Sequence, residues 1–293
     1  MTVKIRDALK EAVDRIVRTG SQTPLLDAEV LLCSILAVDR LYLIINGNQL
    51  LTEEQLHKFQ LYIKKRMAGV PVQYIVGRQE FMGLDFLVEE GVLIPRPDTE
   101  ILVESVLEWI SEKHGKTGTV RIADIGTGSG AIAISLAKLV IGSDVYAVDI
   151  SPKAIKIAGI NREKHQVMSK TTFLLGDLLD PLKDAGLWNK LDVLVSNPPY
   201  IPIGDIPQLQ LEVAGYEPIL ALDGGADGLD FYKRLVEEGW ALLKNGGLLA
   251  FEMGHNQADD IKKLLEENGR YTNIRIIRDL AGIQRVITAE TIK

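Results

Sequence analysis

The 293-residue sequence predicts an α/β fold, a Rossmann-like and mostly parallel sheet, preceded by a small bundle of helices. Three observations support this. After residue 120, short apolar runs alternate with segments of helical length, a glycine-rich turn joins the first such run to the next helix, and residues 1–75 show only helical periodicity. Alternating strands and helices predict a parallel sheet with helices on both faces.

The N-terminal region, residues 1–78, is expected to form a helical domain. Apolar residues recur at helical spacing from Ile5 to Ile16, and a second helix is expected after Pro24. A third begins at Thr52, where Gln55 completes a capping box. The basic run that ends at Arg66 is expected on the solvent side of this third helix.

Residues 79–97 are expected to form a hairpin linker between the two domains. The apolar runs before and after Glu89-Glu90-Gly91 predict a hairpin over 80–95 with its turn at these residues. Pro95-Arg96-Pro97 then predicts a stiff, extended joint. The third part of the chain, residues 98–293, is the predicted α/β domain.

The α/β domain is expected to open with a helix from residue 98 past 109. Strands are predicted over 120–126, 144–150, 171–177, 191–196 and 247–253, and helices over 130–140, 152–162, 228–244 and 256–268. Two further strands, near 272–279 and 283–289, are joined too tightly for a helical crossover. We therefore expect them to pair antiparallel at one edge of the sheet.

Composition restricts the class of protein. The formal net charge of −7 argues against a general affinity for nucleic acid. The single cysteine, Cys33, lies in an apolar run and is expected to be a buried hydrophobe, and the four histidines have no metal-ligand spacing. The N-terminus lacks the apolar stretch of a signal peptide, and no apolar run is long enough to span a membrane, so a cytoplasmic protein is expected.

A glycine turn and a series of carboxylates predict a nucleoside-type cofactor. Gly126, Thr127, Gly128, Ser129 and Gly130 connect a strand to a helix, where glycines permit close approach of a ligand to backbone N–H groups. Each such residue alone could be a simple turn or cap. Together with the carboxylates at successive strand ends they point to the edge where open α/β sheets bind ligands.

The carboxylates narrow the cofactor further. Asp149 ends the next strand, where a carboxylate can accept from ribose hydroxyls, and Asp177 with Leu178 can contact an adenine. No lysine of a phosphate-binding P-loop follows the glycines. Asp124, just before the turn, suggests a ligand with a cationic amino group. S-adenosylmethionine combines an ammonium, a ribose and an adenine, and it is the cofactor we expect.

Asn197-Pro198-Pro199-Tyr200 ends the fourth predicted strand, where the strand order is expected to reverse. The two prolines cannot donate hydrogen bonds, but their carbonyls still accept. The side-chain oxygen of Asn197 and the carbonyl of Pro198 therefore form a rigid pair of acceptors that matches a planar NH₂ group, and Tyr200 offers a flat face. A simple strand-ending turn is the alternative.

Such a pair suits methyl transfer to a planar nitrogen. Two acceptors can return electron density to a delocalised nitrogen and direct it in line toward a sulfonium methyl group. The motif alone does not identify the nitrogen, because it is shared by enzymes that methylate adenine, cytosine, guanine or glutamine. The residues predict the chemistry but leave the substrate open.

The longer motifs show a resemblance to a known family. The stretches from Arg66 through Gly77 to Phe86, from Gly91 to Glu100, and from Tyr216 to Leu229 closely resemble the release factor glutamine methyltransferases, the HemK/PrmC family. With the glycine turn and the Asn-Pro-Pro-Tyr motif, the resemblance covers about residues 60–255. It implies a helical N-terminal domain, a hairpin linker and a class I methyltransferase domain.

The resemblance also implies the substrate. The family methylates the side-chain nitrogen, N5, of the glutamine in the Gly-Gly-Gln loop of class 1 peptide chain release factors, and converts S-adenosylmethionine to S-adenosylhomocysteine. By resemblance, the residues from Gly126 to Gly130, with Asp149, Leu178 and Asn197, line the cofactor site, and those from Asn197 to Tyr200 hold the glutamine amide. The family often carries an aromatic residue where Leu178 stands.

Two alternatives remain. A methyltransferase acting on adenine N6 or guanine N2 of nucleic acid shares the core chemistry, but should need a basic surface with aromatic side chains. A non-catalytic module that binds the cofactor or a translation factor would not need an intact Asn-Pro-Pro-Tyr motif. We expect no stable nucleic-acid binding and no membrane association.

Overall fold

The computed structural model describes residues 3–114 and 118–293. Contacts divide the chain into two compact units. The first comprises residues 1–78 together with 210–216, and the second comprises 79–209 and 217–293. The short segment 210–216 therefore belongs to the N-terminal unit although it lies far along the sequence, which no sequence pattern indicated.

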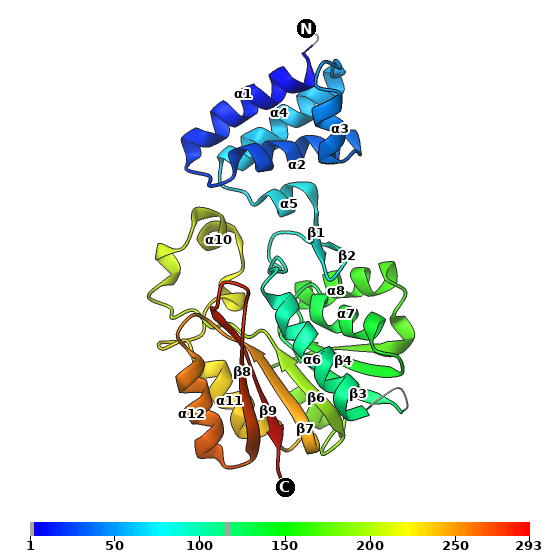
Figure 1. Ribbon diagram of the computed structural model, residues 1–293, viewed down its shortest axis with the longest axis vertical. Helices are drawn as coiled ribbons and strands as arrows, with labels where there is room; N and C mark the ends of the chain where they lie inside the picture. The colour runs from blue at the N-terminus through cyan, green and yellow to red at the C-terminus, as the bar shows by residue number, and fades with distance from the viewer. Residues whose placement is uncertain (1–2, 115–117) are drawn as a thin grey trace. The chain divides into compact units, whose positions relative to one another are not determined.

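The N-terminal unit is helical (Figure 1). Its core contains Ile5, Leu31, Leu32, Phe59 and Ile63, each less than 3% exposed. The third expected helix begins with the predicted capping box, since Thr52 accepts from Gln55 N and the Gln55 side chain accepts from Thr52 N. The helices are α1 (Ile5–Ile16), α2 (Pro24–Leu36), α3 (Arg40–Ile45), α4 (Glu53–Met67), α5 (Val72–Val76) and α10 (Leu211–Tyr216).

Arg66 corrects one prediction for this unit. It was expected on the solvent side of α4, but it is buried, and its Nε donates to Asp27 Oδ2 at 2.8 Å. Its Nη1 lies 2.6 Å from Glu212 Oε2, on α10. Tyr216 also donates its hydroxyl proton to the carbonyl of Ala68 at 2.8 Å. These polar contacts attach α10 to the end of α4.

The second unit begins with a two-stranded sheet, β1 (Arg78–Phe81) and β2 (Leu84–Leu87). The expected turn at Glu89-Glu90-Gly91 is therefore wrong. Met82 and Gly83 connect the strands, with φ of 51° and 72°. A two-residue hairpin turn with both residues at positive φ matches the natural twist of the strands, which explains why the chain turns there.

A seven-stranded sheet with the order β5-β4-β3-β6-β7-β9-β8 forms the centre of this unit. The first five strands in this order are parallel, and β8 and β9 pair antiparallel at one edge, as predicted. β9 also pairs antiparallel with β7. The strands are β3 (Val120–Ile125), β4 (Ser143–Asp149), β5 (Thr171–Leu175), β6 (Leu191–Ser196), β7 (Leu243–Glu252), β8 (Tyr271–Arg278) and β9 (Gln284–Thr291).

Helices cover both faces of the sheet (Figure 1). One apolar core packs α6 and α7 against the sheet, and another packs α9, α11 and α12 against the opposite side. The helices are α6 (Thr99–His114), α7 (Ala131–Leu139), α8 (Pro152–Lys164), α9 (Asp180–Asp184), α11 (Asp230–Gly239) and α12 (Ala258–Asn268). Short 3-10 turns lie at Val17–Thr19, Met168–Lys170, Ile206–Gln208 and Ile219–Ala221.

Two boundaries differ from the prediction. The helix expected over 228–244 ends at Gly239, and β7 begins at Leu243, because Leu242 and Leu243 are fully buried beside β6. The strand expected to reach residue 177 ends at Leu175, which places Asp177 in the following loop. The strand order reverses at β3, which pairs with β4 on one side and β6 on the other. No helix in the described part of the chain is long and apolar enough to cross a membrane.

Candidate active site

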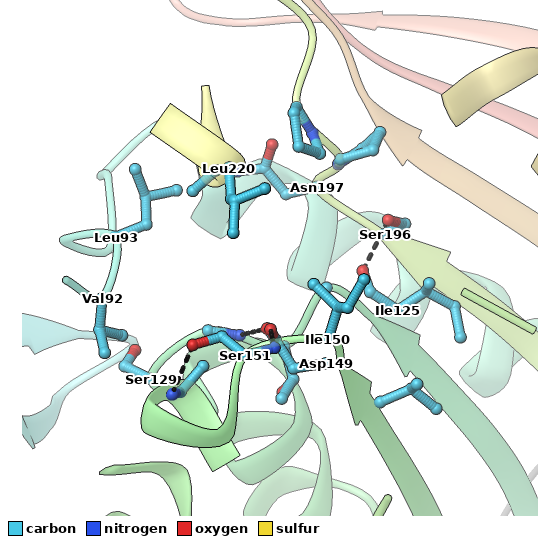
Figure 2. A pocket seen from close by; sticks show the side chains of 18 of the residues that line it. Val92, Leu93, Ile125, Ser129, Asp149, Ile150, Ser151, Ser196, Asn197 and Leu220 are labelled. Atoms are coloured by element: carbon cyan, nitrogen blue, oxygen red, sulfur yellow. Dashed lines mark hydrogen bonds between the residues drawn. The ribbon is translucent and has the colours of Figure 1, made fainter. Parts of the chain in front are cut away.

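A cavity of about 390 Å³ lies at the carboxyl ends of β3, β4 and β6, where the strand order reverses (Figure 2). Its lining is mostly apolar, with a few polar groups that converge on it. The predicted site residues that line it are Gly126, Thr127, Gly128, Ser129, Asp149, Asp177, Leu178, Asn197, Pro198 and Pro199. A cavity of this size and position is typical of small-molecule sites in open α/β sheets.

The glycine turn needs its glycines for two reasons. Gly126, Gly128 and Gly130 all have positive φ, at 74°, 57° and 83°. A Cβ at Gly130 would lie 2.9 Å from Ile134 Cδ1 and 3.2 Å from Ala158 Cβ. Gly130 does not line the cavity; it lets α7 pack closely against α8. The first two glycines allow the backbone itself to form the cavity wall.

Asp149 holds the turn and faces the cavity (Figure 2). Its Oδ2 accepts from Gly128 N at 2.8 Å, and its Oδ1 accepts from Ser151 N at 2.9 Å. Each carboxylate oxygen has a further lone pair, so both remain able to accept from a ligand hydroxyl. Burial raises the pKa of Asp149, while these backbone hydrogen bonds oppose the shift.

Asp124 differs from the expectation of a direct cofactor contact. It is completely buried and lies outside the lining of the cavity. Its Oδ2 accepts from Thr127 Oγ1 at 2.6 Å and from Ala133 N at 3.1 Å. Burial raises its pKa to about 7. The start of α7 covers this carboxylate. Asp124 therefore supports the glycine turn from the protein interior and does not reach the cavity.

Asp177 and Leu178 form another part of the cavity wall. Asp177 Oδ2 accepts from Arg234 Nη2 at 2.6 Å, an ion pair that the sequence did not indicate. Leu178 has a φ of 43°, which is uncommon for a residue with a Cβ. Such backbone strain is concentrated at functional sites. Here it accompanies the sharp turn after β5, next to the cavity.

The Asn-Pro-Pro-Tyr motif leaves β6 and passes along the cavity. Asn197 Nδ2 donates to Thr99 Oγ1 at 3.2 Å, and Pro198 and Pro199 line the cavity. Tyr200 does not line it. Its ring packs against the core below, and burial raises its pKa to about 12. The side chain is half-buried, and its expected role as a flat face for the substrate stays a prediction.

The backbone of the motif is held by residues that sequence reasoning missed or underrated. Gln257 Nε2 donates to the carbonyl of Tyr200 at 2.9 Å. A Cβ at Gly224 would lie 2.8 Å from Tyr200 Cα and 2.9 Å from Pro199 O. Close packing therefore requires a glycine at position 224.

The loop that follows is tied by an ion pair to the segment around Arg96, which lines the cavity. Arg96 Nη2 contacts Glu217 Oε1 at 2.5 Å, and both flank prolines that line the cavity, Pro95 and Pro218. Both residues lie in stretches that carry the resemblance to the family, but the sequence did not indicate that they pair. Their pairing connects two segments that are 121 positions apart, which only the folded chain reveals.

Comparison with known proteins agrees with this geometry. Residues 116–281 match the family model described as a methyltransferase domain, and residues 7–77 match the PrmC N-terminal domain. Among solved structures, the hMettl16 catalytic domain in complex with the MAT2A 3'UTR hairpin 6 superimposes with a TM-score of 0.55 at 18% identity, covering 78% of this chain and 84% of that one. The fold and site define a class I methyltransferase.

Curated relatives identify the family within that class. The chain is 43% identical to the release factor glutamine methyltransferase of Clostridium acetobutylicum, covering 98% of each protein. It is 46% identical to that of Moorella thermoacetica, covering 97% of this chain and 98% of the relative. The chain belongs to the release factor glutamine methyltransferase family.

Proposed function

We propose that the chain transfers a methyl group from S-adenosylmethionine to the side-chain amide nitrogen, N5, of the glutamine in the Gly-Gly-Gln loop of class 1 peptide chain release factors. One observation carries the proposal. The rigid acceptors at Asn197 and Pro198 and the cofactor-type groups at Asp149 and the glycine turn line the same cavity, in a chain of this family.

The cavity suits S-adenosylmethionine. The Asp149 carboxylate retains lone pairs for the ribose hydroxyls, and Asp177 with Leu178 stands where an adenine would lie. Gly126 to Ser129 line the cavity and would border the methionine part. When bound, the cofactor supplies a methyl group on a positively charged sulfur. Asp124 would act on this site through the glycine turn that it braces.

The residues of the motif would orient the glutamine amide. Asn197 Oδ1 and the carbonyl of Pro198 accept from its two N–H groups, which raises electron density on the nitrogen. The nitrogen of the glutamine amide would take the methyl group, and the electron pair of the broken methyl–sulfur bond would remain on sulfur. The nitrogen then releases one proton to water. Pro199 borders the amide, and Tyr200 supports the motif from the core side.

The N-terminal unit would bind the release factor away from its glutamine loop. Leu25, Leu41, Ile44 and Ile45 are more than half exposed on this unit. Leu25, Ile44 and Ile45 also line a surface cavity of about 520 Å³. Exposed apolar side chains that gather on one surface mark a protein-binding site. The acidic net charge is consistent with a protein substrate and no stable binding of nucleic acid.

The direct test offers labelled S-adenosylmethionine to the full chain with three potential acceptors. These are a purified release factor, the same factor with its Gly-Gly-Gln glutamine replaced by alanine, and unmethylated DNA and RNA. Label on the intact factor alone supports the proposal. Label on nucleic acid, with neither protein modified, would contradict it and would favour the adenine or guanine alternative.

A further inference from the structure

Glu252 is a buried acid beside the motif that the mechanism above does not use. It is the last residue of β7 and is 3% exposed. In the parallel pair of β6 and β7, Ser196 lies opposite Phe251, so the next residues, Asn197 and Glu252, follow side by side. The hydroxyl of Tyr232 donates to the carbonyl of Glu252 at 2.9 Å, which fixes its backbone.

The surroundings of the Glu252 carboxylate connect it to the amide of Asn197. Thr99 Oγ1 accepts from Asn197 Nδ2 at 3.2 Å, and the side chains of both residues help to hold down the pKa of the Glu252 carboxyl. Its Oε2 is buried and has no hydrogen-bond partner in the described part of the chain. Because a buried carboxylate is costly unless it is hydrogen-bonded, one held at this position needs an explanation.

The explanation lies in the two ends of the Asn197 amide. Its NH₂ group only donates and its oxygen only accepts. Nδ2 donates to Thr99, and Glu252 is the neighbour of Asn197 on the adjacent strand, so Oδ1 is left for the cavity that Asn197 lines. The reverse orientation would set the amide oxygen against a carboxylate and present an NH₂ group to the substrate NH₂, so both contacts would be repulsive.

We infer that Glu252, acting together with Thr99, is a positioning residue that orients Asn197 so that its side-chain oxygen accepts from the substrate amide. The inference deepens the proposed function and rests on it. Glu252 lies behind the motif and does not touch the substrate. It acts by selecting one of two amide orientations, which differ little in shape but are opposite in hydrogen-bonding character.

Charge on Glu252 is sensitive to pH in the neutral range. Burial raises its pKa to about 7, and the nearby Asp98 adds to this. Arg285, which pairs with Asp98 at 2.9 Å, and the hydrogen bonds from Thr99 and Asn197 oppose it.

Two phenol groups, Tyr200 and Tyr232, also face this carboxylate, and burial raises the pKa of both, so they stay neutral at that pH. The ionised carboxylate of Glu252 can only accept. The protonated acid can also donate to Asn197 Oδ1 and compete with the substrate. The orienting effect should therefore weaken as pH falls through about 7.

Kinetics on the full chain test the inference. In Glu252→Met, which removes the acceptor, we expect kcat for the release factor to fall by about 10²-fold, the range found when one oriented polar group is lost from an active site. The Kd for S-adenosylmethionine and the KM for the factor should each change by less than about threefold, since the binding surfaces remain. Thr99→Val should act similarly, and Thr99→Ser should restore activity. Glu267→Gln, an exposed glutamate on α12, is the control.

A second readout needs no substrate. In protein labelled with ¹⁵N-asparagine, the side-chain NH₂ resonance of Asn197, assigned by its loss in Asn197→Ala, should shift with pH through about 7. The shift should vanish in Glu252→Gln, which keeps the volume and an acceptor but cannot ionise. The same variant should lose the corresponding rise of kcat with pH. Asp124, whose pKa is also raised to about 7, remains in this variant and serves as an internal comparison.

The outcomes separate the inference from the function. One outcome is that the wild-type chain labels the release factor while Glu252→Met keeps a kcat within about twofold of wild type. This result would overturn the positioning role of Glu252 and would leave the proposed function intact. Parallel loss of cofactor affinity and kcat, or an Asn197 resonance that titrates equally in Glu252→Gln, would also overturn it. If the wild-type chain places no label on the release factor, both the proposed function and the positioning role are contradicted.

Discussion

Two aspartates on adjacent strands show how position at the residue scale decides chemistry. Asp124 on β3 and Asp149 on β4 lie at the same edge of the sheet. Asp149 faces the cavity, and each of its carboxylate oxygens accepts one hydrogen bond from a backbone N–H group. Asp124 is completely buried beneath the glycine turn. The sequence predicted both as cofactor contacts. Only Asp149 stands where a ligand can reach it.

Asp149 gives the first prediction. Replacement by asparagine leaves one acceptor oxygen and places an NH₂ group against a backbone donor. Hydrogen bonds to charged groups contribute about 1.5–3 kcal/mol, so we expect the Kd for S-adenosylmethionine to rise about 10- to 100-fold. Isothermal titration calorimetry measures this. Asp144→Asn, on the same strand but outside the cavity, is the matched control, and equal effects of both variants would contradict the assignment.

Asn197 gives the second prediction at the residue scale. Asn197→Ala removes one of the two acceptors proposed for the glutamine amide but none of the carboxylate contacts to the cofactor. Turnover should fall on the order of 10²- to 10³-fold while the cofactor still binds appreciably. Single-turnover methyl transfer with saturating cofactor measures the chemical step. Asn245→Ala, at an exposed position on β7, is the control. Near-normal turnover in Asn197→Ala would contradict the mechanism with two acceptors.

At the scale of elements, local signals predicted the interiors of strands and helices better than their connections. The capping box at Thr52 fixed the start of α4, because both of its hydrogen bonds lie within one turn of helix. The hairpin turn was misplaced because Glu89-Glu90-Gly91 and Met82-Gly83 are both plausible turns. The conformation of Met82 at positive φ is decided by strand pairing.

Arg66 gives a prediction about α4 and α10. Arg66→Ala leaves Asp27 and Glu212 without their shared cation, although Ser21 and Thr23 still donate to Asp27. Breaking a buried ion pair costs about 3–5 kcal/mol, and we expect the lower end of this range.

Urea denaturation measures the loss, and amide hydrogen exchange should rise in α10 because its link to α4 is gone. Lys65→Ala, an exposed residue of the same helix, should change stability by less than about 0.5 kcal/mol. Similar losses in both variants would show that the buried network does not stabilise the unit.

At the scale of the whole molecule, the cavity and the proposed docking surface belong to different units. The second unit holds the complete cavity, since every residue that lines it belongs to 79–209 or 217–293. The N-terminal unit carries exposed apolar side chains that the proposal assigns to the release factor. Residues 210–216, which follow the Asn-Pro-Pro-Tyr motif in the sequence, belong to the N-terminal unit.

A prediction at this scale separates docking from chemistry. Ile44→Ser with Ile45→Ser should raise KM for the intact release factor by about tenfold or more, because burial of each such side chain contributes about 1.5–3 kcal/mol. Activity on a short peptide that contains only the Gly-Gly-Gln loop should stay unchanged. Ile141→Ser, an equally exposed isoleucine of the other unit, is the control. Equal effects on factor and peptide would contradict a docking role.

By itself, the sequence determined the class of fold, the glycine turn and the family. These depend on apolar periodicity, on glycines that must adopt positive φ, and on motifs that are contiguous in the chain. Such patterns can be read from the sequence alone because they depend on residues that are neighbours in the chain. The antiparallel edge was predictable for the same reason, since a short connection excludes a crossover.

Only the tertiary structure decided which polar side chains face the cavity and which support its wall from the protein interior. The Arg96–Glu217 pair and the Gln257 contact with Tyr200 join segments far apart in sequence, and the packing of Tyr200 against the core also depends on distant residues. Glu252 gave one signal, a charge inside the apolar run of β7, but its meaning depends on β6 lying beside it. Burial and hydrogen-bond partners are properties of packing, and no local pattern encodes them.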